Sequence, residues 1–484
     1  MPDLLIAFAL IAVVLLVAAP VSGLVERAPL SFPIIFLSLG YLLGPQGAHL
    51  LAIGVHDETL EVVAILSLAL VLFLDAVNLR FDEGRRAWLV PALTLGPGTL
   101  LVIVAVALAA FLLLGLGVIP ALLLGAVLAS TDPVVLRDVV RDERVPAAVR
   151  RALSVEAGLN DIVVLPIVLV LTAISRASAN GAGDWLLFFL RLLLVGPLVG
   201  FVLGGGGSWL INVMDRHTPI QREYQALYGI GLVLGSYVAG TAVGGDGFLA
   251  AFAAGVAVVI LNTELCDCFL EFGETTAEMA MFLAFILFGA LLSTLLGTLP
   301  LPATIALAAI VNLLARPVAI NLVLLRTKMS WRARAFIGWF GPRGLSSLLF
   351  ALLLVRDRVP GAEYLLAVTG LVVSVSVVAH GTSATPLAAW YGRQVARQTF
   401  QEERESGAEG LFAAPPDAVP RIRVAELAAR LASANPPRVL DVRTHSEYAR
   451  DRARIAGSER VPPERIAAWA KANPPVGSVV TYCT

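Results

Sequence analysis

The chain has 484 residues, of which 58% are hydrophobic and only 15% charged, and its formal net charge is −1. Soluble globular proteins are roughly half apolar and about a quarter charged, so this composition excludes an ordinary soluble domain. The near-zero charge does not point to nucleic acid, and we expect no such partner. Three cysteines, two of them in Cys266-Asp267-Cys268, form neither a disulfide framework nor a zinc-binding spacing.

Apolar runs of about 20 residues recur along the chain, and each is long enough to cross a bilayer. The first run lacks the basic leading region and cleavage site of a signal peptide, so we interpret it as a membrane span. Hydropathy predicts an all-α polytopic membrane protein with about 13 transmembrane helices. The expected spans are 3–21, 30–45, 60–79, 88–115, 118–137, 148–175, 185–213, 224–242, 246–262, 279–298, 302–325, 333–355 and 363–382.

The distribution of basic residues between loops predicts the orientation. If the N-terminus is outside, most arginines fall in cytoplasmic loops, and the outer loops hold only Arg176, Arg356 and Arg358. We therefore expect a multi-pass protein of the cell (plasma or inner) membrane, with the lipid bilayer around it, the N-terminus outside and the C-terminus in the cytoplasm.

The C-terminal part differs in composition from the rest. We expect a membrane domain over residues 1–390, a polar linker over 391–420 and a small α/β unit over 421–484. Within the last unit, a helical pattern at 424–431 precedes a short apolar strand at 438–442. About 65 residues are too few for a comfortable independent α/β domain.

Few ionisable residues fall inside the expected spans. They are Asp75, Asp132, Glu156, Asp161, Arg191, Arg316 and Arg343. Asp75 and Arg191 lie near span ends, where the side chain can extend to the membrane surface. The other five lie deeper, where a charge is costly unless it is paired or hydrated, and such residues indicate an ion or proton pathway.

Two spans carry helix-breaking sequences. Thr131-Asp132-Pro133 interrupts the fifth span, and Gly341-Pro342-Arg343-Gly344 interrupts the twelfth. Asp132 is also suited to cap the second half of its helix. Because the two breaks are seven spans apart, they occupy the same position in two six-helix units, which predicts inverted repeats with crossed broken helices and an ion site at the crossing.

The stretch SVEAGLNDIVVLP, residues 154–166, holds two carboxylates close together. On a helix, Glu156 shares a face with Asn160, whereas Asp161 shares its face with Ala157. The two carboxylates therefore have different surroundings. We expect a cationic partner to hold one of them ionised and the other to exchange protons.

The motifs together resemble those of the monovalent cation/proton antiporter superfamily and, within it, the sodium/proton exchangers of the NhaP and NHE type. The resemblance covers roughly residues 1–390 and five motifs in family order. They are Thr131-Asp132-Pro133, Glu156-Ala-Gly-Leu-Asn160-Asp161, Gly245-Asp-Gly-Phe-Leu-Ala-Ala-Phe-Ala-Ala-Gly255, Arg316-Pro317 and Gly341-Pro-Arg343-Gly344.

The resemblance implies a secondary transporter rather than an enzyme, with no cofactor, that exchanges Na⁺ or Li⁺ for H⁺. It also implies a homodimer in which a six-helix core moves like an elevator against a dimerisation bundle. Asp161 looks like the residue that binds Na⁺ or H⁺ in competition. Thr131, Asp132 and Asn160 look like ligands or supports of that site.

The buried arginines have roles implied by the same resemblance. Glu156 looks like the ion-pair partner of Arg316, which would hold the sixth and eleventh spans together. Arg343 looks like a compensating charge at the second broken helix.

Two positions bear on stoichiometry and selectivity. Electrogenic relatives typically have Asp where this chain has Asn160, together with a nearby lysine, but Lys328 and Lys471 both lie outside the expected spans. One exchangeable carboxylate fits electroneutral 1:1 exchange. Many NhaP-type relatives have a serine ligand at the position of Ala157, one turn before Asp161, so the identity of the cation stays open here.

The C-terminal unit resembles the first half of a rhodanese-like domain. The matching pieces are Val439-Leu440-Asp441-Val442-Arg443, Glu447-Tyr448 and Arg454-Ile455-Ala456-Gly457-Ser458. Cys483 takes the place of the sulfur-carrying cysteine, but the anion-binding loop that would follow it is missing from this sequence. We expect no sulfurtransferase activity.

Two alternative functions remain open. A K⁺/H⁺ antiporter would use the same site. An ion channel or a membrane sensor is the alternative from another class, but no repeated selectivity-filter sequence is visible, and a channel needs no carboxylate that alternates between proton and cation.

Overall fold

The computed structural model describes most of the chain. The described residues are 12–14, 16–17, 31–78, 89–142, 144–176, 182–217, 220–261, 263–327, 329–397, 424–431, 433, 436–442, 453–461, 469–470, 472–473 and 478–482. They belong to two compact units, Met1–Ala414 and Pro415–Thr484. The division falls inside the expected linker, and each unit is described by itself.

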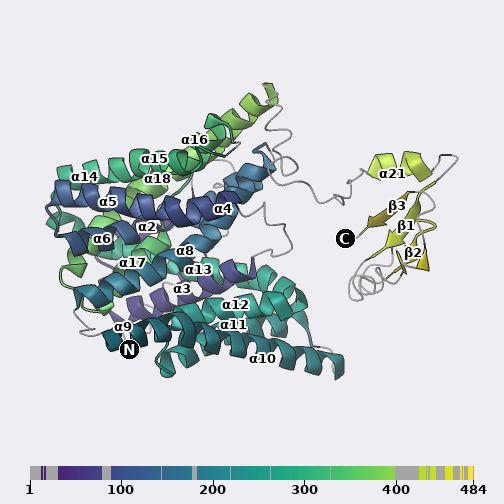
Figure 1. The fold of residues 1–484 in the computed structure, drawn as a ribbon, viewed down its shortest axis with the longest axis horizontal. Coiled ribbons are helices and arrows are strands. Elements are labelled where there is room, and N and C mark those ends of the chain that lie inside the picture. Colours follow the sequence, from purple (N-terminus) through teal and green to yellow (C-terminus); the bar gives the residue numbers. More distant parts are fainter. Residues whose placement is uncertain are drawn as a thin grey trace. The chain divides into compact units, whose positions relative to one another are not determined.

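The first unit is helical throughout its described part (Figure 1). Its α-helices are α2 (Phe32–Leu43), α3 (Glu58–Val77), α4 (Leu89–Leu93), α5 (Thr99–Leu114), α6 (Val118–Val127), α7 (Pro133–Arg141), α8 (Ala147–Ser175), α9 (Ala182–Leu190), α10 (Gly196–His217), α11 (Arg222–Ala242), α12 (Gly247–Leu261), α13 (Thr263–Leu295), α14 (Leu301–Ile310), α15 (Arg316–Val323), α16 (Trp331–Trp339), α17 (Leu345–Arg356) and α18 (Ala362–Arg397). Single turns of π-helix, η2 (Thr94–Gly98), η3 (Arg191–Val195) and η5 (Val311–Ala315), and a 3₁₀ turn, η4 (Leu296–Thr298), join some of them.

The helices confirm the predicted polytopic membrane fold. Within the described residues, seven helical segments are long and apolar enough to cross a membrane, and four shorter apolar helices accompany them. From the second onward, each expected span coincides with a helix or with a pair of half-helices. The first expected span, 3–21, lies largely outside the described residues.

Two helices are longer than the spans expected from the sequence. Helix α13 begins at Thr263 rather than at 279, because the acidic residues Glu264, Asp267 and Glu271 lower the hydropathy of its first half without breaking the helix. Helix α18 continues past 382 to Arg397. In its added turns the ring of Tyr391 stacks on Phe336 of α16, with centroids 4.4 Å apart, so an apolar contact supports the extension.

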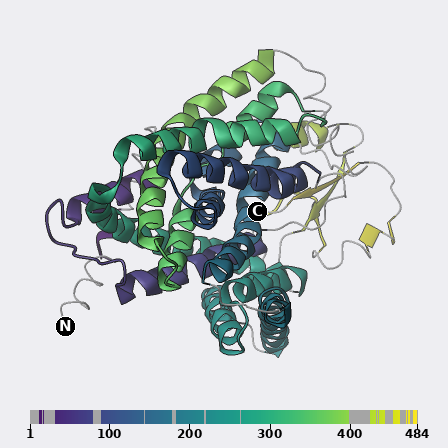
Figure 2. The same ribbon diagram turned by 60° about the vertical axis from the view of Figure 1, so that its left-hand side comes forward.

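The helices form two bundles. The site bundle contains α4 to α8 and α14 to α18, which correspond to the expected spans 4–6 and 11–13. The flanking bundle contains α2, α3 and α9 to α13. In Figure 1 the labels α14 and α5 mark the former and α10, α11 and α12 the latter, and Figure 2 shows the teal helices of the flanking bundle grouped below the others. Helix α3 packs against α8 and α17 and so joins the two bundles.

Both predicted helix breaks are present in the site bundle. Residues 128–132 separate α6 from α7, and residues 340–344 separate α16 from α17. Asp132 has an extended backbone conformation and precedes Pro133 at the first turn of α7. Its N–H donates to the carbonyl of Pro342 at 2.9 Å, so the two breaks meet at this hydrogen bond.

The second unit is a small α/β structure. It consists of α21 (Val424–Leu431) and a parallel sheet of β1 (Arg438–Asp441), β2 (Glu459–Arg460) and β3 (Val479–Tyr482) in the order β2-β1-β3. The Tyr482 hydroxyl donates to Oδ2 of the buried Asp441 at 3.0 Å. Cys483 lies outside the described residues.

Candidate ion-binding site

Asp161 lies in the middle of the site bundle and is fully buried. Helix α8 carries it toward the first helix break, where the Ser130 hydroxyl donates to Asp161 Oδ1 at 2.5 Å. Ser346, in the first turn of α17, lies next to the same carboxyl group. The carboxylate that the sequence singled out is therefore placed where both broken helices meet.

Three predicted site residues have oxygen atoms without a hydrogen-bond partner among the described residues. They are Oδ2 of Asp161, Oδ1 of Asn160 and Oγ1 of Thr131. All three side chains are at most 1% exposed. Buried polar atoms are normally satisfied, so a set of unsatisfied oxygens calls for an explanation, and an ion is one. Oxygen ligands beside unwound helix segments fit a monovalent cation.

Asn160 is oriented by a chain of hydroxyl groups. Its Nδ2 donates to Thr99 Oγ1 at 3.3 Å, Thr99 Oγ1 donates to the carbonyl of Thr94, and Thr94 Oγ1 donates to the carbonyl of Pro91. Thr94 belongs to the π-helical turn η2, and its carbonyl also accepts the backbone N–H of Thr99. The amide of Asn160 is thereby held by its nitrogen, and its oxygen has no partner in the part of the chain that the structure describes.

Asp132 caps two half-helices at once. Its Oδ1 accepts from the N–H of Val134 at 2.8 Å, which caps α7 as the sequence suggested. Its Oδ2 accepts from the N–H of Leu345 at 3.0 Å, which caps α17 in the other broken helix. A carboxylate is stabilised at a helix N-terminus, and here two such ends share one. A Cβ atom on Gly344 would overlap this carboxylate, so the close approach requires glycine.

Arg343 lies in the second helix break and its side chain reaches the first one. Its Nη1 donates to the carbonyls of Ala129 and Ser130 at 2.9 and 3.0 Å, which follow the C-terminal end of α6. Its own N–H donates to Ser376 Oγ of α18 at 2.8 Å. The side chain crosses from one break to the other because the two breaks are in contact, which the linear sequence does not show.

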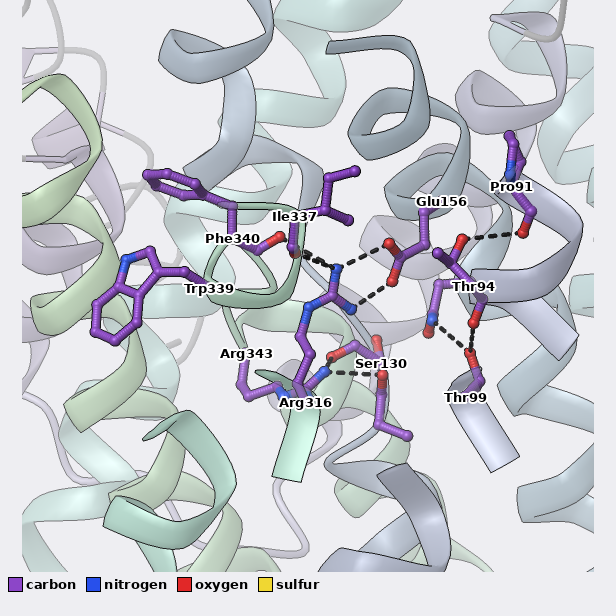
Figure 3. Close-up of polar contacts among 12 residues, drawn as sticks. Pro91, Thr94, Thr99, Ser130, Glu156, Arg316, Ile337, Trp339, Phe340 and Arg343 are labelled. Carbon is purple, nitrogen blue, oxygen red and sulfur yellow. Dashed lines mark hydrogen bonds and ion pairs between the residues drawn. The ribbon is translucent and has the colours of Figure 1, made fainter. Parts of the chain in front are cut away.

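Glu156 and Arg316 form a buried, two-pronged ion pair. Figure 3 shows the guanidinium of Arg316 facing the carboxylate of Glu156, with Nη1 donating to Oε1 and Nη2 donating to Oε2 at 2.8 Å. Nη2 also donates to the carbonyls of Ile337 and Phe340 at 3.3 and 3.2 Å. The pair therefore joins α8 and α15, and Arg316 also caps the C-terminal end of α16.

Asp75 was interpreted from the sequence as a residue that reaches the membrane surface, and this was wrong. It is only 8% exposed, and its Oδ2 has no partner among the described residues. Helix α3 packs against α8, which places Asp75 electrostatically close to Asp161 and Asp132. Arg191, the other residue interpreted in this way, is exposed.

A cavity of about 580 Å³ lies between the two bundles next to the site. Its walls come from α3 and α13 on one side and from α7, α8 and α17 on the other. They include Asp75, Asp132, Ala157, Gly158, Glu278 and Ser346. Arg137 of α7 and Glu278 of α13 form an ion pair across it. Ala157, one turn before Asp161, is 2% exposed and presents only a methyl group.

Sequence reasoning missed three contributors to this site. Asp75, Ser130 and Ser346 were not among the predicted site residues, although Ser130 directly precedes Thr131 in a motif that was singled out. Its position next to Thr131 was the only feature of the sequence that pointed to Ser130. Asp75 and Ser346 approach Asp161 only through the packing of α3 and α17.

Crossed broken helices around a buried carboxylate, beside a polar cavity between two bundles, define a membrane transport protein. Residues 11–390 match the family described as "Sodium/hydrogen exchanger, transmembrane". The chain belongs to this family, whose members are secondary transporters rather than enzymes.

Curated relatives and a solved structure agree with this assignment. The K(+)/H(+) antiporter NhaP of Alkalimonas amylolytica is 29% identical over 379 residues, which cover 76% of this chain and 64% of that protein. The chain therefore spans less than two thirds of the length of that relative. The Na(+)/H(+) antiporter NhaG of Bacillus atrophaeus is 26% identical, with 82% and 77% covered. The sodium proton antiporter MjNhaP1 of Methanocaldococcus jannaschii has the same fold, with a TM-score of 0.65 at 20% identity over 82% of this chain and 99% of that one.

Proposed function

We propose that this protein is an antiporter that exchanges a monovalent cation for a proton, and that both bind Asp161 in competition. The observation that carries this proposal is the state of the buried carboxylates. Glu156 is neutralised by Arg316, and Asp132 accepts two backbone N–H groups. Asp161 has hydroxyl neighbours and one oxygen without a partner in the described part of the chain. Asp75 also has such an oxygen, but of the two only Asp161 lies beside both helix breaks.

Competition explains coupling without further machinery. A carboxylate that holds either a cation or a proton cannot carry both, so each species drives the other across the membrane. Thr131, Asn160 and Asp132 support the site: the first two offer oxygens, and the third fixes the crossing. Because Asn160 does not titrate, Asp161 is the single exchanging carboxylate in this proposal. It carries one cation in one direction and one proton in the other, so the exchange is electroneutral.

Na⁺ or Li⁺ is the first candidate for the transported cation, on the motif pattern of the site. K⁺ is the second candidate, because relatives including those from Alkalimonas amylolytica and Shewanella are named K(+)/H(+) antiporters. In both cases a carboxylate, an amide oxygen and hydroxyls supply hard oxygen ligands.

Alternating access follows from the division into two bundles. In this proposal the site bundle slides like an elevator against the flanking bundle, which forms the homodimer contact. The 580 Å³ cavity opens among Arg137, Arg150 and Arg151, the side that the loop charges predict as cytoplasmic. The structure would then be inward-facing, in a cell membrane, with the N-terminus outside.

We propose that the chain is divided into an antiporter domain over 1–390, a linker over 391–420 and a rhodanese-like unit over 421–484. The parallel sheet β2-β1-β3 supports an α/β unit of this kind. We assign it no sulfurtransferase activity, and release of thiocyanate from thiosulfate and cyanide by the purified protein would contradict this assignment.

The test is cation-specific flux in proteoliposomes under an imposed pH gradient. Na⁺, Li⁺ and K⁺ are added in turn to the unaltered protein, to Asp161→Asn and to the control Glu58→Gln, an exposed carboxylate on α3. We expect at least one cation to discharge the gradient with the unaltered protein and the control, and none with Asp161→Asn. Single-channel currents without proton movement would instead indicate a channel.

A further inference from the structure

The hydroxyl group of Ser130 is the strongest partner that the structure gives to Asp161. Ser130 lies in the break between α6 and α7 and is fully buried. Its hydroxyl donates to Asp161 Oδ1 at 2.5 Å, although the two residues are 31 positions apart in the chain. A hydrogen bond of this length between a hydroxyl and a carboxylate is of the charge-assisted, strong kind.

The oxygen of this hydroxyl remains available to a second partner. A serine hydroxyl has one donor and two acceptor lone pairs, and only the donor is used in the bond to Asp161. Within the described part of the chain no donor to Ser130 Oγ is found, so its lone pairs are available, and the atom lies 2.5 Å from Oδ1. The Ser130 Oγ atom is therefore close enough to this carboxylate to contact a cation that the carboxylate binds.

Arg343 holds Ser130 in this position. The guanidinium donates to the carbonyl of Ser130 at 3.0 Å and to that of Ala129 at 2.9 Å (Figure 3). The peptide that carries the serine is thus fixed from the second broken helix. A ligand group that is already fixed before the ion binds loses no conformational entropy on binding, and this favours a higher affinity.

Position 157 provides the comparison within the chain. Ala157 lies one helical turn before Asp161, on the same face of α8, and lines the cavity. A hydroxyl there would also reach an ion at Asp161, but alanine offers none. Ser130 approaches the same carboxylate from the helix break on α6 and α7 instead.

We propose that Ser130 is a ligand of the transported cation and supplies the hydroxyl that position 157 lacks. This inference rests on the proposed function and deepens it. It makes the two positions exchangeable: a hydroxyl at either one completes the site, and both together strengthen it.

The test compares the half-saturating cation concentration of exchange at fixed pH in proteoliposomes. The variants are Ser130→Ala, Ser130→Thr, Ala157→Ser and the double variant Ser130→Ala/Ala157→Ser. Ser236→Ala is the matched control, because Ser236 is equally buried but lies on α11 of the flanking bundle. The rise of unfolding temperature with added NaCl or KCl, against choline chloride, reports binding independently of transport.

Ser130→Ala is expected to raise the half-saturating cation concentration about ten-fold or more, since it removes a hydroxyl that interacts with the Asp161 carboxylate and its bound cation. Its maximal rate should change much less. Ser130→Thr and Ser236→Ala should behave like the unaltered protein. Ala157→Ser should restore the double variant to within a few-fold and, by itself, lower the half-saturating concentration.

Three results would overturn the inference while exchange by the unaltered protein is intact. The first is a Ser130→Ala variant with unchanged cation dependence. The second is a loss of maximal rate alone. The third is a double variant no better than Ser130→Ala, which would show that the serine merely supports the helix break. If the unaltered protein itself does not exchange cations for protons, the proposed function fails instead.

Discussion

Asp132 and Arg343 lie in different broken helices, and each stabilises a half-helix of the other. Asp132 accepts the N–H of Leu345 at the start of α17, and Arg343 donates to the carbonyls of Ala129 and Ser130, just beyond the end of α6. The negative charge thus meets the positive end of a helix dipole and the positive charge meets a negative end. This reciprocal arrangement ties the two breaks together and fixes the surroundings of Asp161.

Loss of Arg343 should weaken both the fold and the site. In Arg343→Gln the carbonyls of Ala129 and Ser130 lose a charged donor. We expect a destabilisation of about 1–3 kcal/mol, the usual cost of unsatisfied buried groups. Thermal unfolding in detergent measures it. Arg191→Gln, at an exposed arginine, serves as the control, and equal unfolding temperatures for both variants would contradict this account.

The Glu156–Arg316 pair should show strong coupling in a double-variant cycle. Glu156→Gln or Arg316→Gln each leaves one buried charge unpaired, and such losses cost about 3–5 kcal/mol. The double variant should lose clearly less than the sum of the two. Unfolding free energies of all four proteins check this, and strictly additive losses would show that the pair contributes nothing as a pair.

The contact between Gly344 and Asp132 leaves no room for a side chain. A Cβ atom at 344 would overlap the Asp132 carboxylate, so Gly344→Ala must displace it and with it the cap on α17. We expect a cost of about 1–3 kcal/mol, as for other overpacked sites, and a large loss of exchange. Gly235→Ala is the control, since nothing lies within 4 Å of a Cβ atom there. Normal exchange by Gly344→Ala would mean that the cap is dispensable.

Asp75 should assist cation binding from the flanking bundle. Its carboxylate lines the cavity and lies electrostatically close to Asp161, so it attracts a cation that enters. Asp75→Asn should raise the half-saturating cation concentration at least a few-fold while exchange continues. Glu58→Gln, on the same helix but exposed, should leave it unchanged. An Asp75→Asn protein that binds cations normally would place Asp75 outside the site.

The sequence was sufficient for local features and insufficient for contacts between distant segments. The breaks at Pro133 and Pro342 follow from backbone chemistry, and Glu156, Asn160 and Asp161 follow from the cost of polar groups in a membrane. The contact of Ser130 with Asp161 depends on the direction of the chain inside a break, which no periodicity encodes.

Tertiary packing explains the other errors. Asp75 is near the end of an apolar run, as hydropathy indicated, but α3 packs between the bundles and buries it. The contact of Arg343 with the first break was not predicted, because the sequence does not show that the two breaks touch. Helix α13 was predicted too short because acidic residues resemble a loop when only hydropathy is counted.

The central claim is that cation and proton compete for Asp161, and the cation dependence of exchange at several pH values tests it most directly. In proteoliposomes without a membrane potential, the half-saturating cation concentration should rise as the pH falls, approaching ten-fold per pH unit in the acidic range, while the maximal rate stays constant. A maximal rate that falls with pH at a constant half-saturating concentration would contradict competition at one carboxylate.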